Sequence, residues 1–92
     1  MSNILIVTDQ PIYSHSGSII AGPSISVTSV FAGDIAEKKL DAMCIKKQKF
    51  DTILHPMTVT ADTPGSKEIF DFIYKIRDNS DGCRISIYGN KY

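Results

Sequence analysis

Three short stretches of the chain have the composition and the spacing of β-strands. Residues 3–8 form an unbroken, mostly β-branched run closed by Asp9-Gln10-Pro11, which predicts a central strand followed by a turn. Residues 24–31 and residues 83–88 alternate apolar with polar side chains, as half-buried strands do. The sequence therefore predicts strands at the beginning, in the first half and at the end of the chain.

Two further segments allow more than one interpretation. Residues 52–60 have strand composition, but His55-Pro56 interrupts them. Because proline cannot donate a hydrogen bond to a neighbouring strand, this strand is expected at an edge of the sheet, or bulged or split at the proline. Residues 12–23 carry two apolar pairs on either side of a polar stretch, which is typical both of a hairpin and of an exposed loop.

Two segments have helical periodicity. Asp34, followed three residues later by Glu37, resembles a capping box and predicts that a helix begins there. Thr63-Pro64 offers an N-cap followed by a proline at the first position of a second helix, which is expected to end within residues 79–82. The predicted buried stripes are Ala36, Leu40, Met43 and Cys44 in the first helix, and Ile69, Phe72, Ile73 and Ile76 in the second.

The order of these segments predicts one α+β domain that spans residues 1–92. We expect a mostly antiparallel sheet of about four strands with two helices on one face, for which a ferredoxin-like arrangement is one candidate. Hydrophobic residues make up 42% of the chain and charged residues 22%, which is typical of a globular domain. The length leaves no room for a second core.

The residues that carry enzymatic or metal chemistry are scattered. The two histidines, His15 and His55, are far apart, and neighbouring side chains in Ser14-His15-Ser16 point in opposite directions if the segment is extended. Cys44 and Cys83 are isolated from each other and from both histidines, so the close ligand pairs of a zinc site are missing. We therefore expect no enzyme, no catalytic residues, no metal site and no cofactor.

The charge balance limits the partners that the whole chain can bind. Ten basic and ten acidic residues give a formal net charge of zero, whereas a free-standing nucleic-acid binder is usually basic and a DNA mimic is acidic. The apolar run at residues 4–7 is too short for a signal peptide or a membrane span. The expected location is therefore the cytoplasm, with reduced cysteines and no membrane contact.

The charges are nevertheless unevenly distributed. Residues 35–50 contain five lysines and two acidic residues, a net charge of +3, whereas residues 50–81 contain three basic and six acidic residues, a net charge of −3. Two interpretations remain open, namely an ordinary solvated helix face and a basic patch that contacts phosphates or an acidic protein surface. The candidate partner-binding residues are Lys38, Lys39, Lys46, Lys47 and Lys49.

The size of the chain and the order of its segments carry a resemblance to a known family. The strand SISVTSVF at residues 24–31 runs through AGDIAEKK at residues 32–39 into a helix, and a further strand follows near residues 52–60. In this layout the chain resembles small phage-encoded anti-CRISPR proteins that inhibit the type I-F CRISPR surveillance complex.

The resemblance implies a non-enzymatic inhibitor in the cytoplasm of a bacterial host. Such a protein would dock on protein subunits of the RNA-guided effector and sterically block target DNA hybridisation or nuclease recruitment. Its lysines would reach guide RNA or an acidic protein surface, and it would use no small-molecule substrate. The alternative is a small phage or bacterial regulatory module that binds nucleic acid or protein through its lysine-rich helix.

Overall fold

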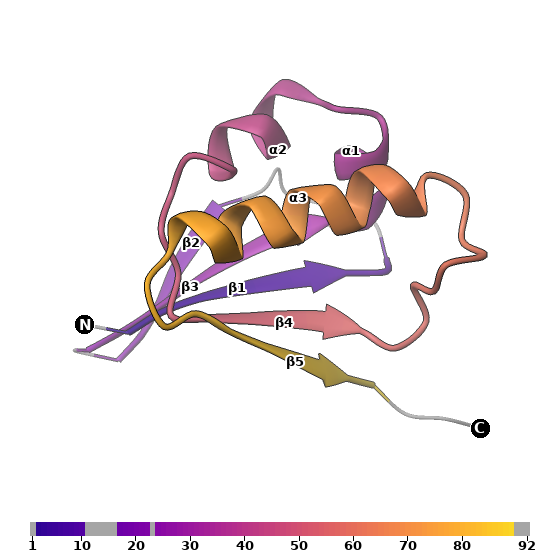
Figure 1. Cartoon of the computed structure of the whole chain (residues 1–92). Helices are drawn as coiled ribbons and strands as arrows, with labels where there is room; N and C mark the ends of the chain where they lie inside the picture. Colours follow the sequence, from indigo (N-terminus) through magenta and orange to yellow (C-terminus); the bar gives the residue numbers. More distant parts are fainter. Residues whose placement is uncertain (1, 11–16, 23, 90–92) are drawn as a thin grey trace.

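The computed structural model describes residues 2–10, 17–22 and 24–89. Within these residues it contains a five-stranded sheet and three helices (Figure 1). In chain order the elements are β1 (Ser2–Thr8), β2 (Gly17–Gly22), β3 (Ile25–Phe31), α1 (Ala32–Ala36), α2 (Leu40–Ile45), β4 (Thr52–Pro56), α3 (Ser66–Asn79) and β5 (Arg84–Tyr88).

The sheet is mainly parallel, so the predicted mostly antiparallel sheet is wrong. The strand order is β2-β3-β1-β4-β5, and the neighbours β3, β1, β4 and β5 all run in the same direction. The edge strand β2 alone pairs antiparallel, with β3. The physical reason lies in the connections, because a helix between two strands returns the chain to the end where the first strand began.

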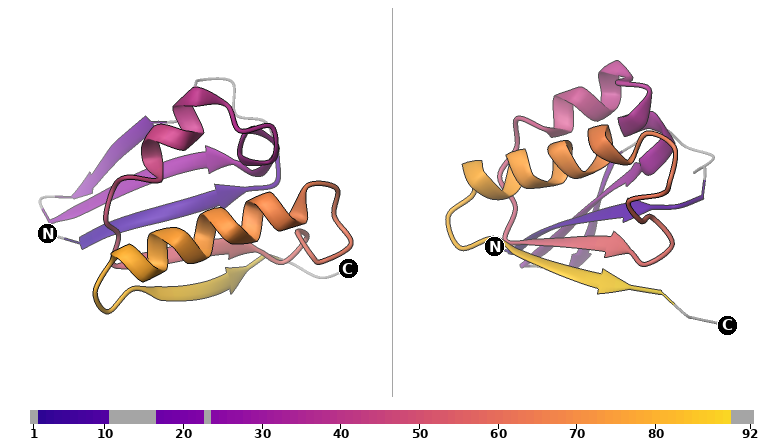
Figure 2. Two further views of the ribbon diagram at one scale, coloured as in Figure 1. Left: turned by 45° about the horizontal axis from the view of Figure 1, so that its top comes forward. Right: turned by 45° about the vertical axis from the view of Figure 1, so that its right-hand side comes forward.

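All three helices lie on the same face of the sheet (Figures 1 and 2). The connection through α1 and α2 leads from β3 across β1 to β4, and the connection through α3 leads from β4 to β5. Both connections move toward the β5 edge of the sheet. Because crossovers between parallel strands are right-handed, their helices lie on the same face of the sheet. The step from β1 to β3 goes the opposite way, but it contains β2 instead of a helix. The second face therefore has no helix within the described residues.

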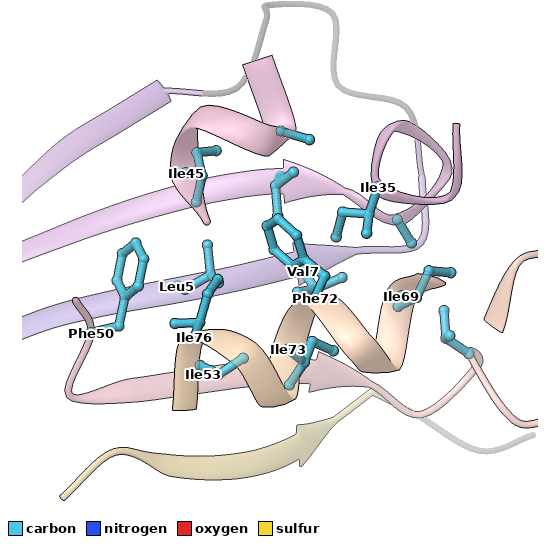
Figure 3. Close-up of a cluster of buried hydrophobic side chains, with 14 residues drawn as sticks. Leu5, Val7, Ile35, Ile45, Phe50, Ile53, Ile69, Phe72, Ile73 and Ile76 are labelled. Carbon is cyan, nitrogen blue, oxygen red and sulfur yellow. The ribbon is translucent and has the colours of Figure 1, made fainter. Parts of the chain in front are cut away.

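The hydrophobic core lies between the helices and the sheet (Figure 3). Leu5 and Val7 of the central strand β1 are fully buried, as the unbroken apolar run predicts. The stripe predicted for the second helix is confirmed, because Ile69, Phe72 and Ile73, together with Ile76, are all buried. Other members of the core are Val30, Ile35, Ala42, Ile45, Phe50, Ile53 and Val59.

The predicted first helix is broken into α1 and α2, so its predicted buried stripe is only partly right. Ala36 and Met43 pack against the core, whereas Cys44 and Leu40 are exposed. The chain leaves α1 through Lys38, which has a left-handed backbone with φ 56°. The amide of Lys39 donates to the carbonyl of Asp34 at 3.0 Å, and the amide of Lys38 donates to that of Ile35 at 3.0 Å. These two bonds form a Schellman motif, which ends a helix. After this break Leu40 is 78% exposed.

The second helix begins two residues later than the sequence predicts. Its N-cap is Gly65, with φ 77°, and the helix starts at Ser66. Thr63 instead closes the preceding turn, because its hydroxyl accepts from the amide of Thr60 at 2.9 Å and its carbonyl accepts from the amide of Ser66 at 2.9 Å. The predicted end of this helix is confirmed, since α3 stops at Asn79.

Strand β4 is internal, so the edge position predicted from His55-Pro56 is wrong, whereas the predicted break of residues 52–60 at the proline is found, because β4 ends at Pro56. The amide of Arg84 donates to the carbonyl of Asp51, and the amide of Met57 donates to the carbonyl of Tyr88. The backbone groups of Asp51 and Met57 therefore point to β5. Because the backbone groups of successive residues in a strand point to opposite neighbours, the nitrogen of Pro56 points to β1. The pairing of β1 with β4 ends two residues before Pro56, at Ile6 and Leu54. The proline thus lies where the β1–β4 ladder stops.

Tyr88 supplies the hydrogen bond that Pro56 cannot donate. A regular parallel ladder would direct the amide of residue 56 at the carbonyl of Val7. The hydroxyl of Tyr88 donates to that carbonyl at 2.7 Å. Burial, and then the charge of Asp9, raise the pKa of Tyr88, so its phenol keeps the proton that it donates.

Replacing Tyr88 by phenylalanine should therefore destabilise the fold by about 1–2 kcal/mol, because the Val7 carbonyl loses its partner. In a Pro56→Ala background the same replacement should cost clearly less, since the new amide at position 56 can donate to Val7. Urea denaturation of the four proteins of this double-mutant cycle measures the difference. Equal costs in both backgrounds would show that the hydroxyl and the proline are not linked.

Candidate functional site

The five lysines predicted to bind a partner do not share one surface. The break between α1 and α2 turns Lys38 and Lys46 toward α3, where both line the same hollow. Lys39 is engaged in ion pairs, Lys47 is exposed, and Lys49 lines a different hollow. The grouping of Lys39, Lys46 and Lys49 that a continuous helix would give is therefore absent.

A hollow of about 210 Å³ lies between the first two helices and α3. We call it the cationic groove, after the three lysines that line it, Lys38, Lys46 and Lys67. Its other lining residues are the apolar Ile35, Met43 and Phe72 and the acidic Glu68 and Asp71. Ile35 and Phe72 are almost fully buried, so the apolar surface that the groove offers is small and comes mainly from the partly exposed Met43, with charges of both signs around it.

Lys67 is a member of the groove that the sequence analysis missed. It lies in the half of the chain with net negative charge, and it belongs to the first turn of α3. The helical periodicity offers a signal, because Glu68, Asp71 and Lys67 follow one another on the same side of the buried Phe72, at about 40°, 100° and 140° from it on a helical wheel. The sequence does not show that α2 lies next to that side of α3.

Lys39 is held by its own helix end. Its ammonium lies 3.5 Å from a carboxylate oxygen of Asp34 and 3.5 Å from one of Glu37. The charge of Asp34, and then that of Glu37, raise the pKa of Lys39. Because two carboxylates already neutralise this lysine, it contributes less to a field that attracts an anionic partner than its position in the sequence suggests.

Lys49 lies at the amino ends of the parallel strands, away from the cationic groove. Its hollow, of about 210 Å³, also contains Asp51 and Asp81. The polar groups there hold the fold together, since Asp51 accepts from the amide of Asn3 at 2.8 Å and Ser80 accepts from that of Phe50 at 3.1 Å. The surroundings of Lys49 are therefore acidic and already hydrogen-bonded.

A larger crevice, of about 450 Å³, lies at the carboxyl ends of β1, β3 and β4. Open parallel sheets bind ligands at the carboxyl ends of their strands, at the point where the connections from two adjacent strands leave in opposite directions. In this sheet that point lies between β1, whose connection leads to β3, and β4, whose connection leads to β5. The crevice combines the Asp9 carboxylate, which accepts a hydrogen bond from the Thr58 hydroxyl, with the apolar Phe31, Val59 and Ile69. The periodicity of the sequence does not predict this crevice, although polar residues directly after a buried strand are a usable signal.

The residues tested for enzymatic chemistry have mainly structural surroundings. His55 is buried, and its ring packs edge-to-face with that of Phe70, with 5.1 Å between the ring centroids. Burial lowers the pKa of His55, so the neutral imidazole is favoured in the folded chain. Cys83 is partly buried, which raises the pKa of its thiol, and Cys44 is exposed. His15 lies outside the described residues. Within the described part of the chain, no group of three or more histidine, cysteine or acidic side chains could hold a metal ion.

Comparison with protein-family models, with curated proteins and with solved structures finds no match for this chain. Within the residues that the structure describes, no helix has the length and apolar character needed to cross a bilayer.

Proposed function

We propose that this chain is a non-enzymatic binding domain that docks through the cationic groove on a protein surface. The resemblance in segment order suggests the type I-F CRISPR surveillance complex as that partner, with steric block of target DNA hybridisation or recruitment as the consequence. The supporting observation is the groove itself, where Lys38, Lys46 and Lys67 surround apolar residues. An apolar anchor side chain flanked by acidic residues would fit this combination.

The charges of the groove favour a protein partner over bare nucleic acid. Glu68 and Asp71 lie beside the three lysines, and carboxylates repel a continuous chain of phosphates. A protein surface can match both signs residue by residue. The neutral net charge of the chain also gives little long-range attraction for DNA or RNA. Contacts of the lysines with guide RNA would then be local and would depend on docking to protein.

The first experiment measures binding of the purified chain to a purified type I-F surveillance complex, and to the matching target DNA and guide RNA alone. We expect binding to the complex, loss of target DNA hybridisation, and no gel shift with the free nucleic acids. Tight binding to bare DNA or RNA would instead support the alternative, a regulatory module that uses its lysines on nucleic acid. Absence of binding to the complex would overturn the proposed partner.

The second experiment reverses two charges in the groove. The variant Lys46→Glu/Lys67→Glu should weaken binding by about tenfold or more, because both changes place acidic groups opposite an acidic partner. The matched control is Lys47→Glu/Lys75→Glu, which makes the same charge change at two exposed lysines outside the groove lining. Circular dichroism and thermal melting check the folding of both variants. Equal loss of affinity in both variants would exclude the groove as the docking site.

A further inference from the structure

The face of the sheet opposite the helices is apolar at its centre. Side chains alternate between the faces of a strand, so the burial of Leu5 and Val7 under the helices directs Ile4 and Ile6 to the other side. In the parallel register, Ile4 lies beside Val27, and Ile6 lies beside Leu54. We call this surface the open face, and its other members on β1, β3, β4 and β5 are Ser2, Thr8, Ile25, Ser29, Phe31, Thr52, Pro56, Arg84, Ser86 and Tyr88.

The centre of the open face carries no second layer within the described part of the chain, although Pro56, near its end, is fully buried. Ile4, Ile6, Val27 and Leu54 are partly exposed, and Ile25 is 40% exposed. Neither Figure 1 nor Figure 2 shows a helix on that side. Parallel sheets are normally covered on both faces, because their strands carry apolar side chains on both sides. A four-residue aliphatic cluster in the middle of a sheet therefore indicates a surface that associates.

The charge of the open face identifies its occupant. Among the residues that β1, β3, β4 and β5 direct to this side, Arg84 on the edge strand is the one with a formal charge. A nucleic acid or a strongly charged protein finds no complementary field here. A second copy of the same face meets no like-charge repulsion at its centre, and its aliphatic cluster provides matching apolar surface.

The size of the face is sufficient for a two-fold contact. Five strands about 4.8 Å apart, with a mean length of about 20 Å, give roughly 500 Å² of projected area per copy. Two copies would bury about 1,000 Å², which reaches the lower range of specific interfaces. We propose that the chain forms a homodimer in which two open faces pack against each other as a sheet-on-sheet sandwich.

This dimer is independent of the proposed docking function. The cationic groove lies among the helices, on the opposite side of the sheet from the open face. Both grooves of a dimer would remain accessible, and substitutions in the groove would leave dimerisation unchanged. The two proposals can therefore fail separately.

The test is analytical ultracentrifugation of the full chain over a wide range of protein concentrations. We expect a monomer–dimer equilibrium, and we expect Val27→Lys to shift it to monomer, because the new ammonium would be buried between the sheets. The matched control is Leu40→Lys, which replaces an even more exposed aliphatic residue on the helix side and should leave the dimer intact. A wild-type chain that stays monomeric at every concentration would overturn the proposal.

A second measurement covers the case in which Val27→Lys does not fold. A dilution series of the wild-type chain can be monitored through NMR amide chemical shifts. We expect dilution to shift the amide signals of β1, β3 and β4 near the open face. Changes confined to β5, together with loss of the dimer in Ile87→Lys, would show pairing through the edge strand and would overturn the face-to-face arrangement. Ile87 is suited to this comparison because it is 70% exposed and its side chain lies on the helix side of β5.

Discussion

Replacing Phe72 by alanine should lower the free energy of unfolding by about 3–5 kcal/mol. Phe72 is 2% exposed and belongs to the core cluster between the helices and the sheet that also contains Leu5 and Val7 (Figure 3). Removal of the ring loses its transfer free energy and leaves a cavity that rigid neighbours fill only partly. A chain of this length has a total stability of about 5–14 kcal/mol. Urea denaturation should therefore show a much lower midpoint, with part of the variant unfolded before denaturant is added.

Phe70→Ala is the matched control, because it deletes the same ring from the same helix. Phe70 is only partly buried, with its ring against His55 and stacked on Tyr74 at 6.3 Å. Its loss should cost about 1–2 kcal/mol, mainly from these ring contacts and a smaller buried area. Equal destabilisation by the two substitutions would mean that α3 does not direct Phe72 into the core. Because Phe72 also lines the cationic groove, neither variant is suitable for measuring partner binding.

Replacing Gly65 by alanine should destabilise the fold by about 2–4 kcal/mol, for two reasons that can be separated. Gly65 has φ 77°, a conformation that costs an alanine about 1 kcal/mol. A Cβ at this position would also lie 2.5 Å from the Cβ of Ala36, at the end of α1. Relief of that contact requires α1 and α3 to move apart, at a cost of about 1–3 kcal/mol. Thermal or urea unfolding measures the total.

Gly82→Ala isolates the first of these costs. Gly82 has φ 71°, but a Cβ there would meet no atom within 4 Å, so its replacement should cost only about 1 kcal/mol. Ala36→Gly removes the opposing methyl group, and the double variant Gly65→Ala/Ala36→Gly should show a favourable coupling of about 1–3 kcal/mol. No coupling, or an equal cost at Gly65 and Gly82, would contradict close packing of the two helices at this point.

The candidate site follows from the sequence only in part. The local excess of lysines is visible in the composition, and two of the five predicted lysines, Lys38 and Lys46, lie in the cationic groove. Lys67 comes from a distant segment, and Lys39 is neutralised by the turn that ends α1. That turn depends on a left-handed Lys38, a conformation that residues other than glycine adopt rarely, so periodicity alone predicts a continuous helix instead.

The sequence by itself determined where most strands lie, and it determined the core stripe and the end of α3. These features depend on the alternation of side chains along one segment, which local sterics and burial fix. Only the tertiary structure decided strand direction and order, the internal place of Pro56, the split of the first helix and the bare open face. Each of these depends on contacts between distant segments, such as the bond from Tyr88 to Val7, and on the hand of the crossovers. Local patterns carry no information about which segment becomes the neighbour.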